Sequence, residues 1–322
     1  MTMLVTIGLN TFNARDTVAA ALHSAIAQDC PRVEIIVVDD ASSDDTVTIL
    51  REIAEGHDHI RIIENQQNLG LAGSRNRIVE NADGEFIVFF DDDDTSRPDR
   101  VRKQIARIKA YEEEFANGAM VFCHSARQQI YPDGRRRIER TMGEVEGIAA
   151  PFGIPVAERI LFGRPLRGAY GSCAGCSQAG RTSSFRALAG FDAVFRRAED
   201  LEFCVRAARS GAHFVGIEET LVTQQMTAGS DKGLEKERTF RRAVLEKHRD
   251  LFKNRTHFEF CRDWMDLRII WLSGDRANFR RGLTALAVRH PIWTLGRLWE
   301  ARRQSEGNRA VRDFHGGGVE TS

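Results

Sequence analysis

Long apolar runs are missing from this chain of 322 residues, and none approaches the ~20 residues of a membrane-spanning helix. The N-terminus lacks the basic flank and apolar segment of a secretory signal, so we expect no signal peptide. Net charge is also absent, since 46 Lys and Arg balance 46 Asp and Glu. This average charge says nothing about a nucleic-acid partner, and we expect none. We expect a cytoplasmic protein, large enough for one big domain or two.

Cysteine is sparse and scattered. The six cysteines of the chain do not form the dense pattern of a disulfide scaffold, which favours a reduced protein. Cys173 and Cys176 form the one close pair, and no second pair follows at the spacing of a zinc site. The sequence therefore indicates neither a disulfide framework nor a structural zinc. Internal repeats are absent as well.

The most informative feature is a run of four aspartates, Asp91–Asp94, directly behind the apolar run 85–90. The apolar run is aromatic and β-branched, which predicts a buried strand. Four carboxylates cannot stay in a core, so they must lie at the carboxyl edge of the sheet, where open α/β folds bind ligands. Their mutual repulsion favours a divalent cation with hard oxygen ligands, Mg²⁺ or Mn²⁺. The alternative is a solvated acidic turn that caps the helix beginning near Pro98.

Strands and helices alternate through the first 125 residues. We predict strands over 4–9, 33–38, 60–63, 86–90 and 119–123, with helices over 16–26, 44–53, 74–81 and 98–108. Repeated βα units of this kind predict an α/β fold with a doubly wound, mostly parallel, Rossmann-like sheet.

The pattern changes after residue 125. Tyr131–Gly134 predicts a turn, and frequent Gly and Pro over 143–190 indicate irregular segments above the ligand face. We predict a helix over 191–209, a strand over 213–217, helices from 235 onward and a disordered tail over 313–322.

Five motifs follow one another along the chain. They are Val5–Asn13, Val37–Thr46, Asn68-Leu-Gly70 with Arg75-Asn76 leading into Asp83–Asp94, Gly190-Phe-Asp192, and Arg196–Asp200. In this order they closely resemble the family 2 glycosyltransferases, inverting enzymes with a GT-A nucleotide-binding fold. The resemblance spans roughly residues 3–250.

The resemblance implies both an activity and a division of the chain. The activity is metal-dependent inverting transfer of a sugar from a nucleoside diphosphate sugar, with UDP as the expected nucleotide and Mn²⁺ or Mg²⁺ as the metal. The acceptor is a hydroxyl of a glycan or lipid-linked molecule, in surface polysaccharide synthesis. Residues 1–125 correspond to the nucleotide-sugar half and 126–250 to the acceptor half of one GT-A domain. C-terminal helices over 251–312 follow.

The resemblance also implies nucleotide contacts at the ends of the first two strands. Asp40 matches the residue that bonds the base. Asn10, Thr11 and Phe12 occupy the exit of the first strand, where the family usually has Pro-Thr-Tyr. Asn10 replaces the proline, and Phe12 can still stack on the base.

Two further residues are implied at the donor site. Gly70 lets the backbone approach the nucleotide closely. Arg75 has two open interpretations, as a ligand of the phosphates or as an ion-pair partner of the aspartates.

The family's Asp-X-Asp metal motif corresponds to Asp91-Asp92-Asp93. By that correspondence Asp93 coordinates the metal, and Asp91 or Asp92 lies near the ribose and the metal's waters, with Asp91 as a second candidate ligand. Asp94 is interpreted as a cap of the following turn. The cation would neutralise the charge that develops on the leaving diphosphate.

The acidic pair Glu199-Asp200 matches the family's catalytic position. Asp200 is the candidate base that removes the acceptor hydroxyl's proton, and Glu199 is its orienting or acceptor-binding neighbour. The simpler interpretation is an acidic pair that stabilises a helix N-terminus.

Two rival functions remain. A nucleotidyltransferase would need a glycine-rich basic loop after the first strand, which the segment 10–16 does not provide. A catalytically dead nucleotide-sugar-binding module would keep the motifs without turnover.

The C-terminal segment 276–312 has nine arginines against two acids, interleaved with tryptophan and leucine. This composition suits peripheral contact with the inner face of the plasma membrane. The alternative is that its aromatics pack on the catalytic domain and its arginines are solvated.

Overall fold

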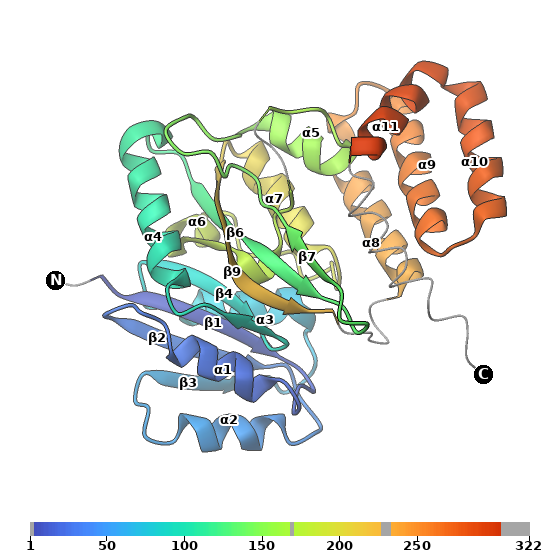
Figure 1. Ribbon diagram of the computed structural model, residues 1–322. Helices are drawn as coiled ribbons and strands as arrows, with labels where there is room; N and C mark the ends of the chain where they lie inside the picture. The colour runs from blue at the N-terminus through green and yellow to red at the C-terminus, as the bar shows by residue number, and fades with distance from the viewer. Residues whose placement is uncertain (1–2, 168–170, 227–232, 304–322) are drawn as a thin grey trace. The chain divides into compact units, whose positions relative to one another are not determined.

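The computed structural model describes residues 3–167, 171–226 and 233–303 (Figure 1). The chain divides into two compact units, residues 1–226 and 227–322. The first unit contains the sheet, and the second is helical where it is described. The tail predicted over 313–322 lies outside the described residues.

The division between the units falls earlier than the sequence suggested. Helix α8 (Leu234–Lys247) belongs to the helical unit, whereas the sequence analysis placed residues up to 250 in the acceptor half. The assignment of a nucleotide half and an acceptor half to residues 1–125 and 126–250 remains a prediction.

One twisted sheet forms the centre of the first unit. Its strands run in the order β3-β2-β1-β4-β8-β6-β9-β5, with β7 paired to β6. The strands are β1 Val5–Thr11, β2 Val33–Asp39, β3 Ile60–Glu64, β4 Phe86–Asp91, β5 Asp94–Ser96, β6 Val121–Ile130, β7 Arg136–Glu139, β8 Ala179–Arg181 and β9 His213–Gln225. Strands β1 to β4 are parallel to one another, and β6 is parallel to β9. The predicted α/β fold with a mostly parallel sheet is confirmed.

The antiparallel strands β5, β7 and β8 were not predicted. Each has only three or four residues, too few to show an alternating pattern. The turn predicted at Tyr131–Gly134 joins β6 to β7, with Gly134 N donating to Tyr131 O at 2.9 Å.

Helices connect and cover the strands. In the first unit they are α1 Val18–Ile26, α2 Thr46–Ala54, α3 Gly70–Asn81, α4 Arg100–Tyr111, α5 Ile154–Phe162, α6 Thr182–Ala187 and α7 Glu199–Arg209. Helices α5 and α6 lie in the segment 143–190, which was predicted to be irregular.

The helix predicted over 191–209 begins only at Glu199, so that prediction is wrong over its first eight positions. Ala198 has a φ of 61°, in the left-handed region, which interrupts a right-handed helix at that residue. Phe191 and Phe195 are buried although they lie outside the helix. Their spacing of four residues resembles the apolar pattern of a helix, which explains the wrong prediction.

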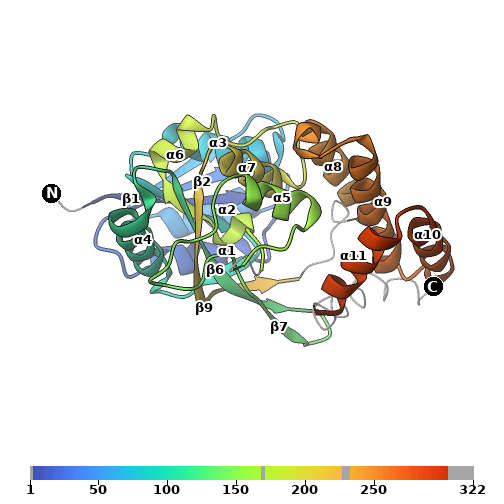
Figure 2. The same ribbon diagram turned by 90° about the horizontal axis from the view of Figure 1, so that it is seen from above.

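Both faces of the sheet are covered, which explains why its strands are almost continuously apolar. Val88 faces a core shared with Val101 and Ile105 of α4. Its neighbour Phe89 points to the opposite face and packs edge-on against Phe185 and Phe191. Figure 2 shows α3 and α6 together on this second face.

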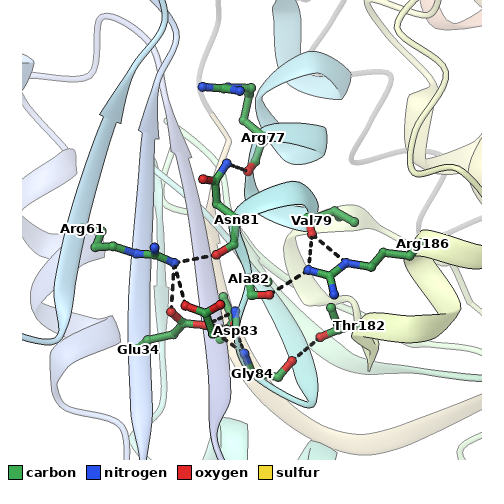
Figure 3. Close-up of polar contacts among 11 residues, drawn as sticks. Glu34, Arg61, Arg77, Val79, Asn81, Ala82, Asp83, Gly84, Thr182 and Arg186 are labelled. Atoms are coloured by element: carbon green, nitrogen blue, oxygen red, sulfur yellow. Dashed lines mark hydrogen bonds and ion pairs between the residues drawn. The ribbon is translucent and has the colours of Figure 1, made fainter.

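A polar network holds the amino end of β4 (Figure 3). Glu34 accepts hydrogen bonds from the backbone N–H groups of Asp83 and Gly84 at 2.7 and 2.9 Å. Arg61 donates to Asn81 O at 2.5 Å, and Thr182 Oγ1 donates to Gly84 O at 2.6 Å. These contacts fix where β4 starts, and therefore where its carboxyl end places the aspartates.

The second unit consists of α8, α9 (Arg255–Leu272), α10 (Arg276–Arg289) and α11 (Pro291–Arg303). Trp293 of α11 packs against Phe260 of α9, with ring centroids 5.2 Å apart. Helices were predicted here, and the structure confirms them. Within the described ranges, none of the helices is both long and apolar enough to cross a bilayer.

Candidate active site

Strand register brings the predicted nucleotide-binding positions to one edge of the sheet. Asn10 of β1 is paired with Asp91 of β4, and Thr11 is paired with Asp39 of β2. These residues lie at the carboxyl ends of three adjacent parallel strands. The aspartate run therefore lies at the sheet edge at which it was predicted.

Asp40 organises the turn that begins α3. Its carboxylate accepts hydrogen bonds from Asn65 Nδ2 at 2.9 Å and from the backbone N–H groups of Leu69 and Gly70, each at 2.8 Å. A carboxylate has about four lone-pair positions, so these three bonds leave one position for a further donor. The sequence indicated the ligand role of Asp40 but not this structural role.

The exit of β1 contacts the aspartate run directly. The backbone N–H of Phe12 donates to Asp92 Oδ2 at 2.9 Å. The Phe12 ring is 44% exposed, which leaves a face free for stacking, and Asn10 Oδ1 has no partner among the described residues. Burial raises the pKa of Asp92 to about 7; the Phe12 amide opposes this rise, and the charges of Asp93 and Asp91 add to it.

Arg75 of α3 lies at the centre of the site. Its side chain is 1% exposed, and it donates to Asp91 Oδ1 at 3.1 Å and to Glu199 Oε1 at 2.9 Å. Burial by itself lowers the pKa of Arg75, but the charges of Asp91, Glu199 and Asp200 outweigh it and raise the pKa above its usual value. Of the two interpretations of Arg75, the ion-pair partner is therefore observed, while contact with a phosphate remains a prediction.

Gly175 gives Arg75 the space it occupies. The guanidinium lies so close to the Gly175 backbone that a Cβ there would overlap Arg75 Nη1. The rings of Phe89 and Phe191 flank the same guanidinium, 5.6 and 5.4 Å from its central carbon. Gly175 therefore serves tight packing at the sheet edge.

The acidic pair Glu199-Asp200 opens α7. Asp200 is partly exposed, with Oδ2 accepting from Gly175 N at 3.2 Å and Oδ1 from Leu201 N at 2.7 Å. Glu199 is 5% exposed, and its burial together with the charge of Asp200 raises its pKa, against the lowering effect of Arg75. The pair thus contains one accessible carboxylate suited to proton transfer and one that Arg75 holds in place.

Asp94 differs from its interpretation as a turn cap. It is 4% exposed, and neither carboxylate oxygen has a hydrogen-bond partner in the part of the chain that the structure describes. Burial and the charges of Asp91 and Asp93 raise its pKa well above the usual range. Asp94 belongs to β5 and pairs with Gln224 of β9, so it lies in a strand and not in a turn.

The Asp91 and Asp94 carboxylates and the Cys176 thiol form a possible metal cluster, with one ligand atom from each within 4.8 Å of the others. Partnerless buried oxygens of this kind fit a hard divalent cation. Asp93 is partly exposed beside the cluster and is not one of its three members. The first choice of Asp93 as metal ligand stays a prediction, and Asp94 is the residue that sequence reasoning missed.

Two asparagines and an arginine complete the site's frame. Arg196 donates to Asn68 Oδ1 at 2.6 Å, and its side chain covers Gly70, whose φ is 78°. Asn76 receives a bond from Phe191 N at 2.7 Å and returns one to Phe191 O at 2.8 Å. Gly70 thus accommodates Arg196 as well as the turn, and close approach of a nucleotide there remains a prediction. The motifs contain Asn68 and Asn76, but no local pattern revealed their partners.

The geometry is that of a GT-A nucleotide-sugar transferase fold. The family model "Glycosyl transferase family 2" matches residues 6–179. This chain belongs to that family and is a glycosyltransferase by class.

Curated relatives agree. The putative glycosyltransferase EpsE of Bacillus subtilis is 28% identical over 222 residues, 67% of this chain and 71% of EpsE. The succinoglycan biosynthesis protein ExoO of Rhizobium meliloti is 40% identical over 106 residues, 33% of this chain and 30% of ExoO. The glucosyltransferase WfaP of Escherichia coli, named for UDP-Glc and α-D-GlcNAc-diphosphoundecaprenol, is 37% identical over 102 residues, 32% of this chain and 40% of WfaP. The match thus spans well under half of ExoO and of WfaP.

Solved structures share the fold at low sequence identity. S. aureus TarS 1-349 in complex with UDP-GlcNAc has a TM-score of 0.63 at 17% identity, over 97% of this chain and 89% of that one. The mannosyltransferase PcManGT of Pyrobaculum calidifontis, in complex with GDP-Man and Mn²⁺, has a TM-score of 0.57 at 18% identity, over 98% and 85%.

Proposed function

We propose that the first unit transfers a sugar, with inversion, from a nucleoside diphosphate sugar to a hydroxyl of a glycan or lipid-linked acceptor. One observation supports this most directly: Arg75 joins Asp91 of the donor edge to Glu199 beside Asp200. One buried side chain thereby connects the proposed donor edge to the acidic pair that contains the proposed base. The names of ExoO and WfaP support surface polysaccharide synthesis and a lipid-linked acceptor. The UDP-GlcNAc complex of TarS supports UDP as the donor nucleotide.

The proposed donor site includes a divalent cation, Mn²⁺ or Mg²⁺. Asp91, Asp93 and Asp94 would hold it, and it would neutralise the charge on the leaving diphosphate. Asp40 retains one lone-pair position for a donor group of the base, and the exposed Phe12 ring is available to stack on it.

Asp200 is the proposed base. It is the partly exposed member of the acidic pair, and its carboxylate accepts from the backbone N–H groups of Gly175 and Leu201. A catalytically dead binding module would keep the donor contacts and show no turnover of a nucleotide sugar.

A thermal-shift panel of UDP, GDP, dTDP and CMP, with and without Mn²⁺, tests the donor site. A ligand present at 100 times its dissociation constant stabilises a protein by about 2.7 kcal/mol, so the true nucleotide should stand out. We expect the shift with UDP to require Mn²⁺ and to disappear in Asp93→Ala and Asp94→Asn. Asp16→Ala is the control, since that side chain is 88% exposed. A UDP shift that is independent of Mn²⁺ and of both substitutions would refute the metal-dependent site.

For the second unit we propose peripheral contact with an anionic membrane surface at the cytoplasmic face. Ile292, Leu295 and Trp299 lie at helical spacing on α11 and are 81%, 67% and 65% exposed. Arg281 and Arg289 of the preceding helix are also exposed. An exposed apolar stripe on one helix, with exposed arginines on the preceding helix, suits the interface of an anionic bilayer, where charge attraction adds to partial burial.

Co-sedimentation with phosphatidylserine vesicles tests this contact. Binding should fall with salt and should drop in Ile292→Glu and Leu295→Glu. Val194→Glu is the matched control, because Val194 is 75% exposed and belongs to the first unit. If all variants bind the vesicles equally well, or if the wild type does not bind them, the proposed membrane contact through Ile292, Leu295 and Trp299 is wrong.

A further inference from the structure

Three side chains with soft or borderline ligand atoms meet inside the first unit. They are His124 of β6, Cys173 in the segment before Gly175, and Cys204 of α7. One ligand atom from each lies within 4.8 Å of the other two. We call this group the soft-ligand cluster. It shares no member with the cluster of Asp91, Asp94 and Cys176.

His124 has the chemistry of a ligand without a partner. It is fully buried, and neither ring nitrogen has a hydrogen-bond partner among the residues that the structure describes. A buried polar group without a hydrogen-bond partner lowers the stability of the folded state by about 1–3 kcal/mol. A buried imidazole without partners therefore needs an explanation. Burial and, secondarily, the charges of Arg127 and Arg100 lower the pKa of His124 to about 3. Both ring nitrogens are left for a ligand such as a bound cation.

The two thiols are placed to share one bound atom with His124. Cys204 is fully buried, and its Sγ lies 3.9 Å from the carbonyl oxygen of Cys173, to which it donates. The amide Nε2 of Gln178 donates to Cys204 Sγ at 3.9 Å. The contact with Cys173 and burial raise the pKa of the Cys204 thiol, so a cation that binds there has to displace its proton. Cys173 is partly exposed and gives the cluster a path to solvent.

We infer that His124, Cys173 and Cys204 bind a thiophilic d¹⁰ cation, Zn²⁺ or Cu⁺, through one nitrogen and two sulfurs. Zinc–sulfur bonds of about 2.3 Å at tetrahedral angles put two sulfurs about 3.8 Å apart, so the cluster needs to contract by no more than about 1 Å. Thiolate and imidazole ligands favour Zn²⁺ and Cu⁺ over the hard cations Mg²⁺ and Mn²⁺.

The site lies next to the proposed base. Gly175, two residues after Cys173, donates its N–H to Asp200 at 3.2 Å, and Cys204 lies one helical turn beyond Asp200 on α7. A cation bound to Cys173 and Cys204 would cross-link the segment that contains Gly175 to helix α7. Gly175 donates to Asp200, and α7 carries Asp200. The inference rests on these contacts and not on the proposed transfer reaction.

The test measures cation binding by the full-length protein, reduced and free of metal. Zn²⁺ is titrated against a chromophoric chelator, and Cu⁺ is titrated anaerobically against its own chelator, both in millimolar Mg²⁺. The excess Mg²⁺ occupies carboxylate sites but does not compete for thiolates. We expect one equivalent of one of the two cations to bind, with an X-ray absorption spectrum that shows two sulfur ligands. Failure of both cations to bind, or a spectrum without sulfur, overturns the inference.

Three substitutions and a control locate the bound cation. Cys173→Ser, Cys204→Ala and His124→Phe should each weaken binding at least about 100-fold, because even residues that only support a ligand are worth 10–100-fold. His124→Phe keeps an aromatic ring stacked on Phe214 and removes the two nitrogens that lack partners. The variant should therefore keep the near-UV circular dichroism spectrum of the wild type, and its Tm should equal or exceed the wild-type value.

Cys261→Ala is the matched control, because Cys261 also lies beside a histidine, 3.5 Å from His257 Nε2, but in the second unit. Its binding should equal that of the wild type. Binding lost in Cys261→Ala and kept in His124→Phe would overturn the inference. Asp93→Ala should lose Mn²⁺-dependent UDP binding and keep the soft cation, which separates this site from the donor site.

Discussion

Replacement of Arg75 by methionine provides the sharpest test of the charge balance in the site. The side chain is 1% exposed and makes ion pairs with Asp91 and Glu199. Methionine keeps most of the packing against Phe89 and Phe191 but leaves two carboxylates without their cation. Breaking a buried pair by removing one partner typically costs about 3–5 kcal/mol.

The cost should depend on pH, and its sign follows from the carboxylates. Without Arg75 the pKa of Glu199 rises further, so the folded variant binds a proton that the unfolded chain has released. Extra protons on the folded state make stability fall as pH rises. Each extra proton changes the free energy of unfolding by up to about 1.4 kcal/mol per pH unit. Burial already raises the pKa of Glu199 in the wild type, so the variant holds only part of an extra proton relative to the wild type over this range. The destabilisation by Arg75→Met should therefore be largest at pH 8 and smaller by about 1–2 kcal/mol at pH 6.

The chain offers separate probes for its two units. All four tryptophans, at 264, 271, 293 and 299, belong to the second unit, and all three tyrosines, at 111, 131 and 170, belong to the first. Tyrosine near-UV circular dichroism then reports unfolding of the first unit, while tryptophan fluorescence reports the second. For a unit of this size a loss of 3–5 kcal/mol lowers Tm by about 6–20 °C. We expect that shift in the tyrosine signal at pH 8, with the tryptophan transition nearly unchanged.

Arg77→Met is the control on the same helix, since Arg77 is 43% exposed and pairs with the exposed Glu80. Its effect should stay within about 0.5 kcal/mol. If Arg75→Met unfolds no earlier than Arg77→Met, the buried ion pairs do not support the fold. If the loss is large but equal at pH 6 and pH 8, lost packing and not unpaired charge is its cause.

Three further predictions concern the site. Asp200→Asn should keep donor binding and lower the transfer rate by about 10²–10⁴, and a wild-type rate would place the base elsewhere. Because the pKa of Asp92 is about 7, Mn²⁺-dependent UDP binding should strengthen between pH 6 and pH 8 as the carboxylate ionises; calorimetry that shows weaker binding at pH 8 would contradict this. Gly175→Ala should push on Arg75 and destabilise the first unit by about 1–3 kcal/mol in denaturant titration, whereas Gly233→Ala, with nothing near its added Cβ, should not.

The parts of the fold that the sequence predicted have local signals. The apolar run before Asp91 predicts a buried strand because its residues occur in succession, and β4 spans Phe86–Asp91. The start of α7 has no such signal. Its position depends on the left-handed backbone at Ala198, a non-glycine residue that sequence patterns do not mark for that conformation.

The contacts that unite the site were beyond sequence reasoning for a different reason. Arg75 and Glu199 are 124 positions apart in the chain, and Gly175 must leave room for the guanidinium between them. Contacts at such separations depend on how the whole sheet brings its segments together, which no window of residues contains. The clearest case is Cys173. Its spacing suggested a pair with Cys176, whereas the folded chain brings it to Cys204 and His124.

Two effects offset the repulsion between the carboxylates at the acidic edge of the sheet. Buried cations provide the first, since Arg75, Arg100 and Arg127 are 1%, 1% and 7% exposed. Protonation provides the second, because burial raises the pKa values of Asp92 and Asp94. A divalent cation bound among these carboxylates would replace the second effect and release the protons. Cation binding and proton release are therefore coupled at this edge, and the folded state should gain most from the cation at the pH where Asp92 would otherwise still hold its proton.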